Sequence, residues 1–102
     1  MKAKIRAVEN EISEIKRQLL LIDEMRPGSL SQQKRARGAL YHQLSYRNDG
    51  RGHTEYVREE DISVVQQQLA AYRTYVTLSK RWITLSIELC RLKVVYLRSG
   101  EH

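Results

Sequence analysis

Cationic and hydrogen-bonding side chains gather in the middle of this chain, and their chemistry suits contact with a nucleic acid. Arg and Lys side chains neutralise phosphates, and Gln can read the edge of a base. An ordinary polar hairpin tip is the alternative explanation for the same residues, and the sequence leaves both open. The candidate contacts are Lys34, Arg35, Arg37, Tyr41, Gln43, Arg47, Arg51 and His53.

The positive charge of the chain is concentrated around these candidates. The 102 residues carry 18 Lys and Arg against 12 Asp and Glu, a net charge of +6. Residues 26–53 hold six basic residues and one acidic residue, whereas residues 1–25 are balanced. A local excess of this kind favours an acidic partner. We expect DNA rather than RNA, although the sequence does not separate DNA, RNA and an acidic protein.

The other reactive side chains do not predict a catalytic or metal centre. His42 and His53 have only Glu55 as a further nearby ligand, too few for a metal site. The carboxylates of residues 59–61 are explained by the start of a helix, where the helix dipole favours negative charge. Cys90 lies in an apolar stripe and is expected to be a small buried hydrophobic residue. We therefore expect no enzyme activity, no metal and no cofactor.

Apolar spacing predicts the helix that precedes the basic segment. Six apolar residues recur at intervals of three and four, which predicts a coiled-coil-like helix over residues 1–25: Ile5, Val8, Ile12, Ile15, Leu19 and Ile22. Pro27 and Gly28 end this helix. Residues 29–32 have the spacing of a capping box, which predicts a short basic helix or loop over residues 29–38.

A β-hairpin is predicted over residues 39–58. Two β-rich runs flank Asp49 and Gly50, which tolerate the positive φ of tight hairpin turns. In the first strand, one face holds Leu40, His42, Leu44 and Tyr46, and the other holds Tyr41, Gln43, Ser45 and Arg47. The register of the second strand is left open. A two-stranded hairpin is marginal alone, so its leucine face must pack on a helix or on another chain.

One long helix is predicted over residues 59–98, which contain no Pro or Gly. It carries two apolar stripes, one with Leu78, Trp82, Leu85, Leu89, Leu92 and Tyr96, and the other with Ile83, Ile87, Cys90, Val94 and Leu97. This helix would be ~58 Å long against ~35 Å for the first. Antiparallel pairing beside the hairpin would bring Glu9 and Glu11 towards Lys80 and Arg81, and would leave residues 87–97 uncovered.

Such an uncovered apolar ridge predicts self-association into a homodimer or higher oligomer. The expected interface contains Trp82, Leu85, Leu89, Leu92, Val94, Tyr96 and Leu97. The predicted fold class is mainly α: long antiparallel coiled-coil-like helices with a short β-hairpin inserted between them, in one domain of residues 1–102 that forms a dimeric helical bundle. Charged residues interrupt every candidate leader or membrane segment, so we expect a cytoplasmic protein without a membrane partner.

A series of short motifs resembles an uncharacterised prokaryotic domain family of small proteins encoded near mobile-element genes. The motifs are Arg26-Pro27-Gly28-Ser29-Leu30, Leu44-Ser45-Tyr46 with Asp49-Gly50, Thr54-Glu55-Tyr56-Val57 and Leu69-Ala70-Ala71-Tyr72-Arg73. The resemblance implies a mobile-element or phage context, with a recombinase or transposase as a partner, and no activity. Some relatives carry a Cys-rich insertion before the hairpin. Residues 31–38 here contain neither Cys nor His, so a zinc role does not transfer.

These observations lead to one function hypothesis and one alternative. The hypothesis is a non-enzymatic nucleic-acid-binding accessory protein in DNA recombination, in which a dimer presents two basic hairpins at a fixed separation. The alternative is an adaptor or inhibitor whose apolar C-terminal helix binds another protein. In that case the basic residues serve solubility.

Overall fold

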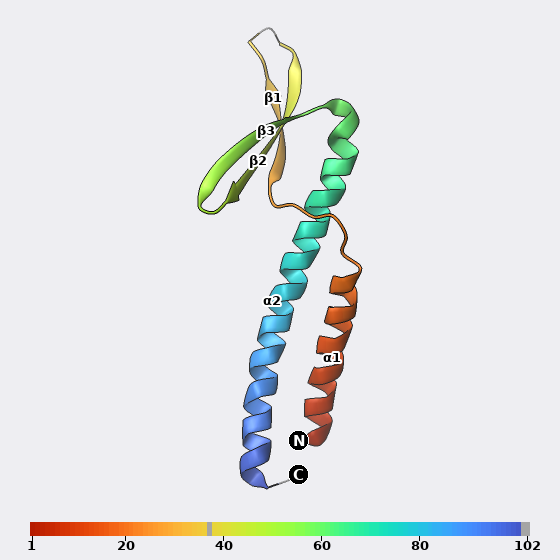
Figure 1. The fold of residues 1–102 in the computed structure, drawn as a ribbon, viewed down its shortest axis with the longest axis vertical. Helices are drawn as coiled ribbons and strands as arrows, with labels where there is room; N and C mark the ends of the chain where they lie inside the picture. Colours follow the sequence, from red (N-terminus) through yellow and green to blue (C-terminus); the bar gives the residue numbers. More distant parts are fainter. Residues whose placement is uncertain (37, 101–102) are drawn as a thin grey trace. The chain divides into compact units, whose positions relative to one another are not determined.

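A computed structural model describes residues 1–36 and 38–100, and the helices and strands are shown in Figure 1. In chain order the elements are α1 (Lys2–Leu20), β1 (Ser29–Lys34), β2 (Leu40–Asn48), β3 (Arg51–Val57), a 3-10 turn (Glu59–Asp61) and α2 (Ile62–Ser99). The chain, expected to be one domain, divides into two compact units. A helical unit comprises Met1–Ile22 and Tyr75–His102, and a sheet unit comprises Asp23–Thr74.

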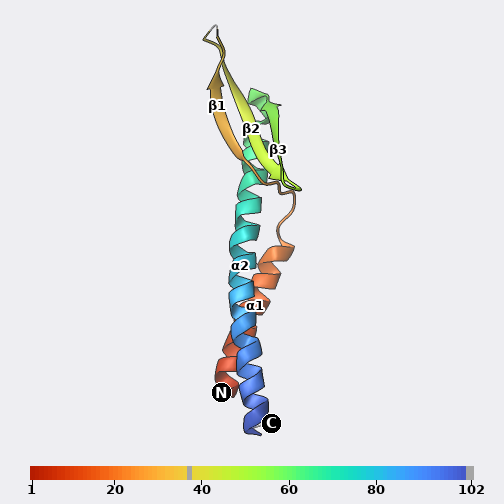
Figure 2. The ribbon, with the colours of Figure 1, turned by 90° about the vertical axis from the view of Figure 1, so that its left-hand side faces the viewer.

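The predicted mainly α fold with one short hairpin is wrong. The structure is 61% helix and 22% strand, and its antiparallel sheet has three strands in the order β1-β2-β3. Figure 2 shows the strands side by side with β2 in the middle. The additional strand is β1, which lies where a short basic helix was predicted for residues 29–38.

β1 pairs with β2 along its whole length, from Ser29 opposite Ser45 to Lys34 opposite Leu40. Two side-chain hydrogen bonds accompany this pairing: Ser31 Oγ donates to the Gln43 carbonyl (3.4 Å) and Gln33 Nε2 donates to Ser31 Oγ (3.1 Å). A short polar segment gains little as an isolated helix. Pairing with β2 satisfies the backbone groups on one side of this edge strand and therefore determines its conformation.

The hairpin between β2 and β3 turns at Asp49 and Gly50, as predicted. Their φ angles are 53° and 75°, and Asn48 pairs directly with Arg51 across the turn. The pairing continues without interruption to His42 opposite Val57. The register that the sequence left open is therefore that of a tight two-residue turn without a bulge.

The core of the sheet unit lies between one face of the sheet and the beginning of α2. Leu44 is fully buried and packs with Val57, Val65 and Leu69. Leu30, Tyr46 and Ile62 are partly buried around them. The predicted leucine face of β2 thus packs on a helix within the same chain.

The core of the helical unit follows the apolar repeat of α1. Four residues of this helix are buried, namely Ile5, Val8, Ile12 and Ile15. Val8, Ile12 and Ile15 form one buried cluster with Leu85 of α2, which is only 2% exposed. Leu19, Leu78, Trp82, Leu89 and Leu92 are partly buried and pack against it. The helices run antiparallel, with the start of α1 beside the last turns of α2 in Figure 1.

The predicted overhang of residues 87–97 is wrong, because α1 lies further along α2 than expected. Lys93 Nζ lies 3.1 Å from Glu9 Oε2, and Lys4 Nζ lies 3.8 Å from Glu88 Oε1. The expected approach of Glu11 to Arg81 is confirmed at 2.7 Å. α1 ends at Leu20 rather than at residue 25, and the sheet packs on the early apolar residues of α2. The later residues of α2 are therefore the ones that α1 covers.

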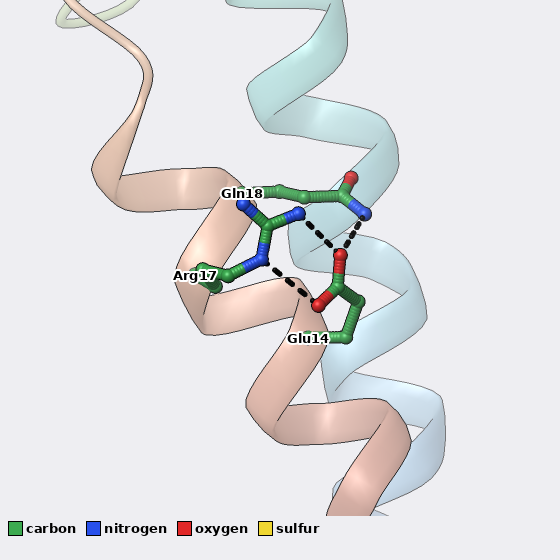
Figure 3. A network of polar contacts seen from close by, with 3 residues as sticks. All are labelled: Glu14, Arg17 and Gln18. Atoms are coloured by element: carbon green, nitrogen blue, oxygen red, sulfur yellow. Dashed lines mark hydrogen bonds and ion pairs between the residues drawn. The ribbon is translucent and has the colours of Figure 1, made fainter.

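The last turns of α1 carry a local polar network. The Glu14 carboxylate accepts hydrogen bonds from Arg17 (2.9 and 2.5 Å) and from Gln18 (3.2 Å), as Figure 3 shows. The bond from Arg17 is the main cause that lowers the pKa of Glu14 from 4.5 to about 2. In the part of the chain that the structure describes, neither helix is long and apolar enough to span a membrane.

Candidate nucleic-acid interface

The sheet register separates the predicted nucleic-acid contacts onto two faces. One face packs on α2. We call the other the outer face, and it consists of Ser29, Ser31, Gln33, Tyr41, Gln43, Ser45, Arg47, Gly52, Thr54 and Tyr56. None of these positions is aliphatic or acidic. Side chains alternate along a strand, so Tyr41, Gln43 and Arg47 share this face as the sequence predicted.

Three predicted contacts lie on the helix-facing side instead. Lys34 pairs with Leu40, Arg51 with Asn48, and His53 with Tyr46. The His53 ring stacks on the Tyr46 ring with centroids 5.0 Å apart. The predicted contact at Arg37 lies outside the described residues. The sequence thus grouped residues that the pairing of β1 and β3 with β2 divides between two surfaces.

An aromatic and cationic cluster lies on the outer face. The rings of Tyr41 and Tyr56 have centroids 6.4 Å apart and planes inclined by 33°. The Arg35 guanidinium carbon lies 4.9 Å from the Tyr41 centroid and 5.9 Å from that of Tyr56. Tyr56 is 61% exposed. Sequence reasoning missed Tyr56, which alternation along β3 would have placed beside Gln43 if the register had been known.

The turn between β1 and β2 positions Arg35 at one end of this face. The Arg35 backbone N–H donates to the Ala39 carbonyl (2.8 Å), and the Gly38 N–H donates to the Arg35 carbonyl (2.9 Å). Gly38 has a φ of +84°, a conformation that glycine adopts without steric cost. These bonds fix the backbone from which the guanidinium reaches the tyrosine rings.

The carboxylate of β3 is neutralised on the helix-facing side of the sheet. Arg26 Nη2 donates to Glu55 Oε2 at 2.6 Å, and its guanidinium lies 5.2 Å from the Tyr46 centroid. The hydrogen bonds from Arg26 and then Tyr46 lower the pKa of Glu55. The hydrogen bond between Tyr46 and Glu55, and then burial, raise the pKa of Tyr46. The outer face therefore presents cations without a carboxylate among its own residues.

The predicted dimer interface also divides into covered and exposed residues. Trp82, Leu85, Leu89 and Leu92 pack against α1, and Tyr96 is half-buried. Val94 and Leu97 are exposed. The second predicted stripe of α2 lies on the surface, and we call its members Ile83, Ile87, Cys90, Val94 and Leu97 the exposed stripe. Cys90 was expected to be buried, and that prediction is wrong because α1 covers the neighbouring stripe.

Among the described residues, no three His, Cys, Asp or Glu side chains are grouped closely enough to hold a metal ion. Comparison with family models, curated proteins and solved structures finds no match to this chain. The resemblance to a family encoded near mobile elements stays a prediction. A functional assignment therefore rests on the geometry and charge of the outer face.

Proposed function

We propose that this protein binds nucleic acid through the outer face of its sheet, as a non-enzymatic accessory protein. The supporting observation is the cluster of Arg35, Tyr41 and Tyr56 beside Gln43, with Arg47 further along the same face and no acidic side chain among the positions of that face. Tyr56 and Arg47 are exposed, and Tyr41 and Gln43 are half-buried. β-sheets that recognise nucleic acids present cationic, amide and aromatic side chains in this way. The helix-facing side supplies the hydrophobic core, which leaves the outer face available to a ligand.

The dimensions of this face suit several nucleotides. Tyr41 and Arg47 lie at opposite ends of the outer face on β2, and strand geometry separates their Cα atoms by about 20 Å. Phosphates along one strand of B-DNA are spaced by about 3.4 Å along the axis, so this length corresponds to about six nucleotides. Arg35 and Arg47 would then contact phosphates at the two ends, with the tyrosines and Gln43 facing bases between them.

DNA in the cytoplasm, in the context of a mobile element or phage, is the partner proposed on the basis of the family resemblance. A recombinase or transposase acting on that DNA would be the second partner. In this proposal the chemistry of recombination would belong to that enzyme. The present protein would position or protect the nucleic acid.

We also propose that two copies associate through the exposed stripe of α2. Ile83 is 61% exposed and Val94 54%, and a hollow of about 430 Å³ beside Trp82 is lined by Ile83, Ile87 and Cys90. Association would bury these apolar side chains and present two outer faces to one nucleic acid. Sedimentation velocity of the wild type and Ile87→Glu tests this contact. A dimer that Ile87→Glu dissociates is expected, whereas a monomeric wild type would contradict it.

Salt-dependent binding tests the proposed function itself. Fluorescence anisotropy of a labelled 16-nucleotide DNA, in single-stranded and duplex forms, is measured at 50 and 200 mM salt. Each phosphate contact contributes a slope of about −0.7 to −0.9 in log K against log salt, so two contacts correspond to about tenfold weaker binding across this range. The double variant Arg35→Ala, Arg47→Ala lacks both of these contacts. We therefore expect its binding to weaken less than that of the wild type between 50 and 200 mM salt.

The matched control is the double variant Arg6→Ala, Arg98→Ala, which removes the same charge from exposed positions on α1 and α2. It is expected to bind within about threefold of the wild type. The proposal is overturned if neither DNA form binds at 50 mM salt and a single-stranded RNA of the same sequence does not bind either. Equal losses in both double variants would show that net charge alone is responsible, which would also overturn it.

A further inference from the structure

We propose that Tyr41 and Tyr56 form a stacking platform for unpaired bases, so that the outer face prefers a single-stranded nucleic acid to a duplex. This inference rests on the proposed function and specifies its ligand. The two tyrosines are the only aromatic residues at the positions of the outer face. Their rings lie 6.4 Å apart, within the range of interacting aromatic pairs.

The position of this pair is not explained by folding of the sheet unit. Its hydrophobic core lies on the opposite face, where Leu44, Val57, Val65 and Leu69 are buried. Tyr46 is the sheet tyrosine that packs against that core. Tyr56 instead leaves 61% of its surface exposed to solvent. Large rings on an otherwise polar surface lose contact with water when a flat ligand covers them, which favours binding.

Arg35 places a second type of planar group over the same two rings. Its guanidinium carbon lies 4.9 Å from the Tyr41 centroid and 5.9 Å from that of Tyr56, in the range of cation–π contacts. Bases stack both on aromatic rings and on guanidinium planes in proteins that bind single strands. The same cation attracts the phosphate that accompanies each base. Arg35, Tyr41 and Tyr56 together offer stacking and charge at one place.

Two glutamine side chains lie beside the rings and suit hydrogen bonding to base edges. Gln33 is directly opposite Tyr41, and Gln43 is directly opposite Tyr56. The Nε2 of Gln33 donates to Ser31 Oγ at 3.1 Å, which fixes its orientation on the sheet. An amide carries both donors and an acceptor, so it can pair with exposed edges of different bases. This combination favours contact with bases over contact with phosphates alone.

The preference for single strands follows from which part of a base is accessible. In a duplex the faces of the bases are stacked on their neighbours, and only their edges are exposed in the grooves. A tyrosine can reach a base face there only if the base is unstacked, which costs a few kcal/mol. In a single strand the same faces are available without that cost. Tyr41 and Tyr56 therefore contribute to binding of a single strand and much less to binding of a duplex.

The experiment is a competition between a single-stranded 16-mer of mixed sequence and the duplex of the same sequence, measured by anisotropy at 50 mM salt with the full chain. DNA and RNA single strands are compared in separate arms. We expect the single strand to bind at least tenfold more tightly than the duplex. Tyr56→Ala should weaken single-strand binding by about 5- to 30-fold, the effect of losing one base stack, and change duplex binding less than twofold.

Three further variants separate stacking from other roles of the same side chain. Tyr56→Phe keeps the ring and should bind as the wild type does, within twofold. Tyr56→Leu keeps an apolar side chain without a π face and should lose single-strand binding as Tyr56→Ala does. Thr54→Ala, on the same strand and face, is the matched control and should change binding less than twofold. Circular dichroism establishes that each variant is folded, and Tyr56→Leu replaces Tyr56→Ala if the latter is not.

The possible results distinguish this inference from the function on which it rests. If the duplex binds as tightly as the single strand and Tyr56→Leu is unchanged, while loss of Arg35 and Arg47 weakens binding, the stacking inference is overturned and the proposed function stands. If Tyr56→Phe loses as much binding as Tyr56→Leu, the contribution of Tyr56 comes from its hydroxyl group. That result would also overturn the stacking inference. If neither form of DNA or RNA binds, the proposed function fails.

Discussion

Substitution of Gly28 tests the close approach of the chain to β2 at the start of the sheet. Gly28 has a φ of +135°, and a Cβ added there would lie 2.8 Å from the Ser45 carbonyl oxygen and 3.0 Å from Leu44 Cδ1. The backbone conformation alone costs an alanine about 1–3 kcal/mol. Displacement of the carbonyl and of the buried leucine adds about 1–3 kcal/mol. We expect Gly28→Ala to lower the free energy of unfolding of the sheet unit by about 2–6 kcal/mol.

Two other glycines separate these causes of destabilisation. Gly50 has a φ of +75° and open space where a side chain would lie, so Gly50→Ala should cost about 1–2 kcal/mol. Gly52 has neither a positive φ nor a close neighbour, so Gly52→Ala should change stability by less than about 0.5 kcal/mol. The assay is urea unfolding followed by far-ultraviolet circular dichroism, with amide hydrogen exchange along β2. A loss at Gly28 no larger than that at Gly52 would refute the close approach to Ser45.

The remaining predictions concern the helical unit. Leu85→Ala should lower the free energy of unfolding by about 2–5 kcal/mol, because Leu85 is buried, whereas Leu20→Ala should cost less than about 0.5 kcal/mol, because Leu20 is 86% exposed. Urea unfolding followed by tryptophan fluorescence measures both, and equal losses would contradict the assignment of the buried stripe. NMR titration should give Glu14 a pKa of about 2, and Arg17→Ala should return it towards 4.5. Since folding lowers this pKa, the contribution of Glu14 to stability is complete above pH 4.5 and is lost as the pH falls through 2. An unchanged pKa in Arg17→Ala would show that the hydrogen bond is not its cause.

The helices were predictable because their apolar residues repeat with a clear period. Ile5, Val8, Ile12 and Ile15 were identified from spacing alone and are buried in the structure. The end of α1 was not predictable, since Ile22 continues the repeat after the helix has ended at Leu20. The earlier end of α1, at Leu20 rather than at residue 25, changes which residues of α2 it covers. It explains why Leu89 and Leu92 were expected at an interface between copies and instead pack within the chain.

The strand β1 was missed because its sequence carries almost no hydrophobic pattern. Only Leu30 is apolar between Ser29 and Lys34, and a local capping-box spacing favoured a helix there. Its conformation depends on pairing with β2, which lies later in the chain. Interactions between distant segments of this kind leave little trace in local sequence. A third strand therefore became apparent only in the structure.

Only part of the candidate site was predicted, because the rest depends on pairing between strands that are distant in the sequence. Alternation along β2 correctly grouped Tyr41, Gln43 and Arg47 on one face. Assignment of the neighbouring strands required the register, which places Tyr56 beside Gln43 and moves His53 to the opposite face. Local alternation thus predicts a face of one strand. Which residues of other strands join it depends on turn geometry and long-range pairing.

The most direct test of binding by the outer face is an NMR titration of the isotopically labelled protein with a single-stranded 16-mer. We expect the side-chain amide signals of Gln33 and Gln43 and the backbone signals of Tyr41 and Tyr56 to shift in proportion to occupancy. Signals of residues 75–99 should move little at the first equivalent. Shifts confined to the helical unit, or no shifts at low salt, would contradict the assignment of nucleic-acid binding to the sheet.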